Sequence, residues 1–179
     1  MTRIIVFMFL SLLLTPFAFA DDQSVGQYKL ASGDVVKLVV YGEPDLSAEE
    51  IRLNDAGNFS APFIGMIPAA GKTAYEVSQI IKQKLVDGGY LKAPEVTISA
   101  VSYREFYISG EVIKAGGYPY QPGLTVDKAV ALAGGLTERA SKKKISITRG
   151  TGDKRSELQA EFNSRVEPGD TITIDQGFF

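Results

Sequence analysis

The chain has 179 residues, of which 45% are hydrophobic and 22% are charged, and its formal net charge at pH 7 is −2. This balance is sufficient for a packed core and argues against wholesale disorder. Because the sequence contains no Cys and no His, it excludes disulfide frameworks, thiol nucleophiles, Cys-ligated zinc and imidazole-based catalysis.

The first twenty residues predict a secretory signal peptide that is not part of the fold. Arg3 precedes an apolar run at 4–14, and the segment ends in Ala-Phe-Ala at Ala20. A helix over the apolar run would span about half of the ~30 Å hydrocarbon layer. We expect cleavage between Ala20 and Asp21, with a membrane anchor that stays attached as the alternative. No Cys follows this site, so we expect a periplasmic chain that is not lipidated.

The segment from residue 28 to 101 predicts short strands before its helix. Apolar runs at 35–41 and 51–53 predict strands, and the Asn, Asp and Gly residues of 54–58 are typical of a turn. Residues 59–68 are apolar but contain Pro and Gly, which favour an edge strand or an irregular crossing loop.

The clearest helix is expected to begin at Thr73. Thr73 and Glu76 have the spacing of a capping box, in which their side chains satisfy amides of the first turn. Apolar residues recur at helical spacing over 77–85, and the glycine pair at 88–89 predicts the end of the helix. Over 96–101 the period changes to two, which predicts a strand.

A second module is expected from about residue 105 to 174. Its predicted elements are a strand at 106–112, a turn at 114–119, a helix capped by Thr125, a strand at 145–148, a hairpin turn at 150–153 and a strand at 171–174. Gly33-Asp34 and Gly169-Asp170 each precede a strand, which fits an internal repeat or two independent turns. Both modules combine short strands with one helix, so we predict an α+β fold of two small mixed domains.

Motifs in both modules, taken in order, resemble the outer-membrane polysaccharide export family. In the first module they are Tyr28-Lys29-Leu30, Gly33-Asp34, Asp55-Ala56-Gly57-Asn58-Phe59, Ala61-Pro62-Phe63-Ile64-Gly65 and Gly71-Lys72-Thr73. In the second they include Tyr107-Ile108-Ser109-Gly110-Glu111-Val112, Ala133-Gly134-Gly135 and Pro168-Gly169-Asp170-Thr171-Ile172. The resemblance implies a signal peptide at 1–20, a polysaccharide export N-terminal domain at 21–103 and an SLBB (β-grasp) domain at 104–176.

The resemblance also implies a function and partners. It implies a periplasmic component of a capsule or exopolysaccharide export machine, assembled as a homo-oligomeric ring or conduit that passes polysaccharide toward an outer-membrane channel. The longest members of the family carry a lipidated Cys, further β-grasp modules and a C-terminal amphipathic helix, which we do not find here. We therefore expect two partners, an inner-membrane polysaccharide copolymerase and a separate outer-membrane β-barrel. The alternatives are a periplasmic module that binds a glycan or small ligand, and an adaptor between the copolymerase and the barrel.

Aromatic and basic residues are the candidate contacts to a glycan or a partner. The aromatic candidates are Tyr90, Tyr103, Tyr118 and Tyr120, whose alternative role is that of half-buried fold residues. The basic candidates are Lys142, Lys143 and Lys144, in a stretch from 139 to 155 that has seven basic residues and one acidic residue. The alternative for this stretch is a solvated hairpin with a cationic edge.

Catalysis, cofactors and nucleic acid are not expected. Glu49 and Glu50 are adjacent, so on a strand they point to opposite faces and do not converge on one substrate. We therefore predict no enzyme activity and no catalytic, metal or cofactor-binding residues. Removal of residues 1–20 takes away only Arg3 and leaves a net charge of −3, which argues against nucleic acid as a partner.

Overall fold

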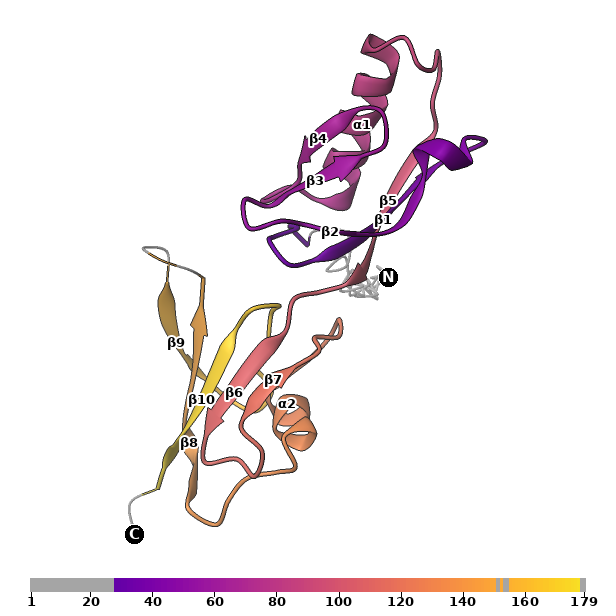
Figure 1. Cartoon of the computed structure of the whole chain (residues 1–179). Helices are drawn as coiled ribbons and strands as arrows, with labels where there is room; N and C mark the ends of the chain where they lie inside the picture. Colours follow the sequence, from indigo (N-terminus) through magenta and orange to yellow (C-terminus); the bar gives the residue numbers. More distant parts are fainter. Residues whose placement is uncertain (1–27, 151, 153–154, 178–179) are drawn as a thin grey trace, which may run out of the picture.

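The computed structural model describes residues 28–150, 152 and 155–177. The predicted signal peptide and its cleavage site therefore lie outside the described residues. Two domains follow one another along the chain and are joined by a short extended segment at 103–105 (Figure 1). The two groups of buried apolar side chains separate at this segment, one drawn from residues 30–98 and the other from 106–174. Each domain contains one α-helix and several strands, which confirms the predicted α+β class.

The first domain is built on a small antiparallel sheet with one helix. Its elements are β1 (Val35–Val40), the 3-10 helix η2 (Pro44–Leu46), β2 (Ala48–Arg52), β3 (Asn58–Ala61), β4 (Gly65–Pro68), α1 (Ala74–Asp87) and β5 (Val96–Ser102). The sheet order is β2-β1-β5, and β3 and β4 form a separate hairpin. Val77, Ile81 and Leu85 of α1 are buried, as the helical spacing predicted. The capping box of Thr73 and Glu76 is also confirmed.

Residues 59–68 form a hairpin, so the prediction of one edge strand or a crossing loop was wrong. β3 pairs with β4 in antiparallel register, with Asn58 opposite Pro68 and Ala61 opposite Gly65. The turn contains Phe63, which has a φ of 61°. A bulky residue is uncommon in this left-handed conformation, so Pro62 and Gly65 in this segment did not by themselves indicate a tight hairpin.

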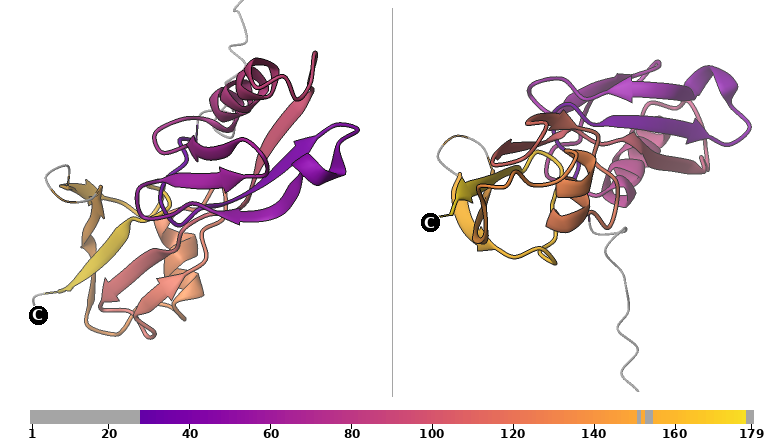
Figure 2. Two further views of the ribbon diagram at one scale, coloured as in Figure 1. Left: turned by 45° about the horizontal axis from the view of Figure 1, so that its top comes forward. Right: turned by 90° about the horizontal axis from the view of Figure 1, so that it is seen from below.

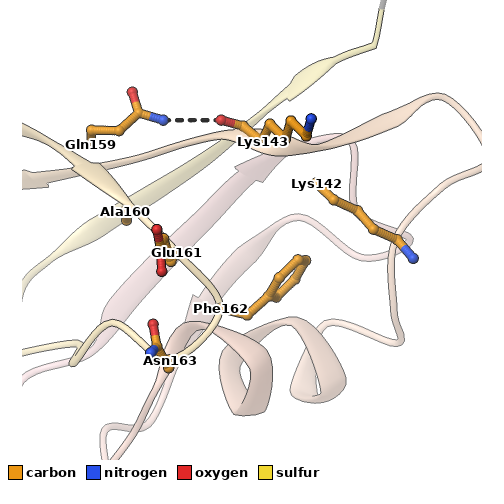
Figure 3. A pocket seen from close by; sticks show the side chains of 7 residues that line it. All are labelled: Lys142, Lys143, Gln159, Ala160, Glu161, Phe162 and Asn163. Atoms are coloured by element: carbon orange, nitrogen blue, oxygen red, sulfur yellow. Dashed lines mark hydrogen bonds between the residues drawn. The ribbon is translucent and has the colours of Figure 1, made fainter.

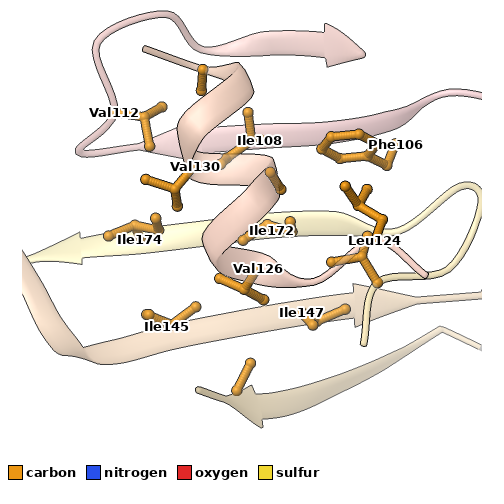
Figure 4. Close-up of a cluster of buried hydrophobic side chains, with 14 residues drawn as sticks. Phe106, Ile108, Val112, Leu124, Val126, Val130, Ile145, Ile147, Ile172 and Ile174 are labelled. Carbon is orange, nitrogen blue, oxygen red and sulfur yellow. The ribbon is translucent and has the colours of Figure 1, made fainter. Parts of the chain in front are cut away.

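The second domain packs one helix on one face of a mixed five-stranded sheet (Figures 1 and 2). Its elements are β6 (Phe106–Gly110), β7 (Gly116–Tyr118), α2 (Val126–Leu132), β8 (Ala140–Arg149), β9 (Ser156–Ala160) and β10 (Thr171–Gln176). The strand order is β7-β6-β10-β8-β9, with β6 and β10 parallel and the other pairs antiparallel. Isoleucines of β6, β8 and β10 point toward α2 and form the core (Figure 4).

No residue range was predicted for the two edge strands of this sheet, although the hairpin turn predicted at 150–153 implies a strand after it. Residues 116–118 form β7, where we expected only a turn, and 156–160 form β9. β7 has three residues, two of them glycine, and β9 is polar and exposed over its first four residues. β7 is too short to show an alternation, and in β9 only Leu158 and Ala160 alternate with polar residues. Such edge strands can be held by their ladder hydrogen bonds alone. Within the described residues, neither α1 nor α2 has the length and apolar character needed to cross a bilayer.

Candidate functional site

The Gly-Asp pairs at 33–34 and 169–170 form the same turn in the two domains. The Asp34 N–H donates to the Ala31 carbonyl, and the Ala31 N–H donates to Asp34 Oδ2 at 2.8 Å. Asp170 repeats both hydrogen bonds with Glu167, the second at 2.7 Å. The preceding glycines have φ values of 89° and 86°, which a residue with a Cβ rarely adopts. The sequence pattern therefore marks one local structure used twice.

The two buried carboxylates bind different groups. Asp170 is 1% exposed and forms a bidentate pair with Arg149 at 2.8 and 2.9 Å. The hydrogen bond to Asp170 raises the pKa of the Arg149 guanidinium. This cation of the basic stretch therefore stabilises the fold by binding a buried carboxylate. Asp34 is 0% exposed and accepts hydrogen bonds from the Tyr28 hydroxyl at 2.6 Å and from the Arg104 N–H at 3.0 Å.

Arg104 connects the two turns. Its N–H donates to Asp34, and its Nε donates to the Pro168 carbonyl at 2.8 Å. A Cβ added to Gly169 would lie 2.4 Å from that Nε, so the guanidinium packs directly against the second turn. The first domain is thus hydrogen-bonded to the second through a single residue of the connecting segment. We call Asp34, Arg104 and Pro168, with the tyrosines described next, the domain joint.

Three tyrosine rings continue the domain joint. Tyr28 and Tyr103 meet edge to face with centroids 4.9 Å apart, and Tyr103 meets Tyr120 in the same way at 5.5 Å. Burial and the hydrogen bond to Asp34 raise the pKa of the Tyr28 hydroxyl above its usual value. Burial likewise raises the pKa values of Tyr103 and Tyr120. Two predicted contact residues, Tyr103 and Tyr120, therefore lie half-buried between the domains.

The other two tyrosine candidates lie apart from the domain joint. The Tyr118 ring stacks on Phe106 with centroids 5.9 Å apart, and its hydroxyl donates to the Lys114 carbonyl at 2.7 Å. Tyr90 follows α1, is 50% exposed and donates to the Phe63 carbonyl at 3.1 Å. Tyr90 thereby holds the left-handed turn of the β3–β4 hairpin against the end of the helix. Phe63 itself is 68% exposed.

Two of the three candidate lysines line an open pocket of about 490 Å³ in the second domain (Figure 3). The pocket is lined by Lys142, Lys143 and the segment from Gln159 to Asn163. Gln159 Nε2 donates to the Lys143 carbonyl at 3.1 Å and joins the two sides. Lys144 does not line it. The sequence nominated the lysines but not 159–163, because β9 itself had not been predicted.

Metal-binding chemistry has no support in the described part of the chain. No group of three or more Asp or Glu side chains is arranged there to hold a metal ion. Every buried side-chain nitrogen or oxygen among the described residues has a hydrogen-bond partner. The buried carboxylates of Asp34 and Asp170 each accept three hydrogen bonds from the surrounding fold.

Comparisons with known proteins identify both domains. Residues 22–101 match the family model "Polysaccharide biosynthesis/export protein", and residues 106–158 match the model of the SLBB domain. The chain therefore contains a domain of the polysaccharide export family followed by an SLBB domain. The resemblance drawn from the motifs is thereby confirmed. The first of these families is a family of export proteins, so the match is to export proteins and not to a class of enzymes.

Curated relatives of this chain are named for capsule and exopolysaccharide systems. The exopolysaccharide production protein ExoF of Rhizobium meliloti is 39% identical over 114 residues, which cover 62% of this chain and 27% of ExoF. The EPS I polysaccharide export outer membrane protein EpsA of Ralstonia nicotianae is 25% identical over 182 residues, which cover 83% of this chain and 47% of EpsA. The capsule polysaccharide export outer membrane protein CtrA of Neisseria meningitidis is 35% identical over 127 residues, which cover 66% of this chain and 32% of CtrA. The chain spans less than half the length of each of these relatives.

Proposed function

We propose that the chain is a periplasmic component of a capsule or exopolysaccharide export machine. The observation that carries the proposal is the ordered pair of an export domain and an SLBB domain, the same pair of families that the sequence motifs indicated. In this role the chain forms part of a homo-oligomeric ring or conduit through which polysaccharide passes toward an outer-membrane channel. It binds polymer without changing it chemically, so it is not an enzyme.

The surface features of the second domain support this role. A moving polymer requires weak, repeated contacts, because a deep and tight site would retain it. The pocket beside Lys142 and Lys143 is open, and it is the candidate contact that the proposal retains. The domain joint supports a conduit as well, because its hydrogen bonds and ring contacts restrain the angle between the two domains in every copy. Identical copies with a fixed shape are what a closed ring requires.

The localisation and partners belong to the same proposal. Cleavage between Ala20 and Asp21 would release a non-lipidated chain into the periplasm, with the export domain at 21–103 and the SLBB domain at 104–176. Contact with the outer membrane would then come from a separate β-barrel, and contact with the inner membrane from a polysaccharide copolymerase. Mass spectrometry of the protein purified from the periplasm tests the processing, since a product beginning at a residue other than Asp21 contradicts it.

A deletion strain tests the export role. Loss of the chain should leave polymer in the periplasm and remove it from the cell surface, and the plasmid-borne wild-type chain should restore the surface polymer. Electron microscopy and quantification of cell-surface and periplasmic polysaccharide provide the measurement. Normal surface polymer in the deletion strain would refute the proposal. An adaptor that only bridges its partners would lack polymer crosslinks, so crosslinking to nascent polymer separates adaptor from conduit.

The pocket also favours a second candidate, a monomeric periplasmic glycan receptor. Light scattering on the processed protein separates this candidate from the conduit. A concentration-dependent oligomer supports the ring, whereas a monomer at high concentration with saturable 1:1 glycan binding supports the receptor.

A further inference from the structure

The pocket of the second domain has two cationic groups on one side. Lys142 and Lys143 lie at the start of β8, and both side chains are exposed. Neither ammonium group forms an ion pair or a hydrogen bond with a residue that the structure describes. This differs from Arg149 of the same basic stretch, whose charge is neutralised by Asp170 and Glu167. Two charges of the stretch that have no ion-pair partner among the described residues are thus present at the pocket.

The opposite side of the pocket offers an aromatic ring and polar groups. The Phe162 side chain points into the hollow and is only partly buried, with one side packed on the core below α2 (Figure 3). Exposed Glu161 and Asn163 flank it. Gln159 uses its amide nitrogen on the Lys143 carbonyl, which fixes the amide and leaves its oxygen as an acceptor. An apolar ring face surrounded by amides and a carboxylate suits a sugar, which has an apolar face and peripheral hydroxyls.

We infer that this pocket binds an acidic sugar unit of a polysaccharide, with the sugar carboxylate on Lys142 and Lys143. The inference rests on the proposed export function and deepens it by naming the substrate class as an anionic polymer. The sugar ring lies on Phe162, and its hydroxyls donate to Glu161 and to the Gln159 amide oxygen. The Glu161 carboxylate repels the sugar carboxylate and so fixes which end of the unit faces the lysines.

The charges and openness of the pocket make this contact weak and fast. Exposed ion pairs each contribute little free energy and are screened by salt. One unit therefore binds weakly, while a polymer that presents many units is attracted by many copies of the pocket in an assembly. Such contacts hold an anionic chain near the protein without stopping its movement.

Binding of alginate oligosaccharides, which carry one carboxylate per sugar, tests the inference against neutral dextran of the same length. The probe is titrated into the full processed chain, with chemical shifts of residues 142–163 and calorimetry as readouts. Alginate should bind, dextran should bind about tenfold more weakly or not at all, and added salt should weaken alginate binding. The double variant K142Q/K143Q should lose about fivefold to tenfold in affinity.

A matched control removes two positive charges elsewhere. Lys82 and Lys92 are exposed residues of the first domain, and the variant K82Q/K92Q should keep wild-type alginate affinity. Equal losses in the two double variants, or equal binding of dextran and alginate, would overturn the inference, as would the absence of alginate binding. A third variant, Phe162→Leu, leaves the charge unchanged and keeps an apolar side chain on the core, and it should still reduce affinity severalfold because the sugar loses its aromatic face. The deletion strain remains a separate test, because export can be lost there even if the polymer is neutral.

Discussion

Replacement of Asp34 by Ala should destabilise the protein more than any other single carboxylate change in the first domain. The carboxylate is fully buried and accepts from the Tyr28 hydroxyl at 2.6 Å, the Ala31 N–H at 2.8 Å and the Arg104 N–H at 3.0 Å. The substitution removes the acceptor and leaves three donors without a partner. One of these donors belongs to the connecting segment, so the loss extends to the second domain.

The magnitude follows from the cost of unsatisfied buried donors. Each costs about 1–3 kcal/mol, and partial access of water to the two amides brings the total for Asp34→Ala to ~3–5 kcal/mol. For a protein of this size the melting temperature falls by about 2–4 °C per kcal/mol, so we expect a decrease on the order of 10 °C. Tyr28→Phe removes one donor and keeps the carboxylate, so its cost should be smaller, about 1–2 kcal/mol.

Urea unfolding of the processed chain, followed by circular dichroism, measures these free energies. Asp55→Ala is the matched control, because Asp55 is exposed in the same domain and its replacement should change stability by less than about 0.5 kcal/mol. A loss below ~1 kcal/mol for Asp34→Ala would refute the reasoning, since it would mean that the donors find other partners easily.

Two further predictions concern the domain joint and the second sheet. The fold raises the pKa of the Tyr28 hydroxyl above its usual 10.0, so the stabilisation is complete below about pH 10 and decreases above it, where the unfolded chain loses this proton. In urea titrations between about pH 8 and 11, Tyr28→Phe should therefore show a shallower loss of stability than wild type, and identical slopes would contradict this assignment. Gly110→Ala should cost more than about 2 kcal/mol, because its φ is 84° and a Cβ would lie 2.1 Å from the Ile174 carbonyl oxygen. Gly65→Ala is the control, with a φ of 72° and no atom within 4 Å, and should cost only about 1 kcal/mol; equal costs would mean that β6 and β10 separate readily.

Much of the fold could be predicted because it depends on local patterns. The capping box at Thr73 and the apolar stripe that follows specify α1 within one helical segment. The apolar run of β1 is buried on most of its positions. The hairpin of β3 and β4 was missed because its turn depends on Phe63, whose left-handed φ is held by tertiary contacts such as the hydrogen bond from Tyr90.

The candidate sites were predicted less completely, for a similar reason. A run of lysines is visible in sequence, so the sequence nominated the two residues that line one side of the pocket. The other side comes from residues around Phe162 that carry no pattern of their own. The domain joint depends on pairs such as Asp34 and Arg104, which are 70 residues apart. No periodicity in the sequence connects them, and only the repeated Gly-Asp pairs gave a hint.

The short connection between the domains has a mechanical consequence. Only residues 103–105 separate β5 from β6, and the middle one, Arg104, is hydrogen-bonded to both sides. A linker of this length has little extra chain to extend, so a pull on either domain reaches the other after little movement. In the proposed conduit, the drag of a passing polymer on one domain would therefore also act on the other domain.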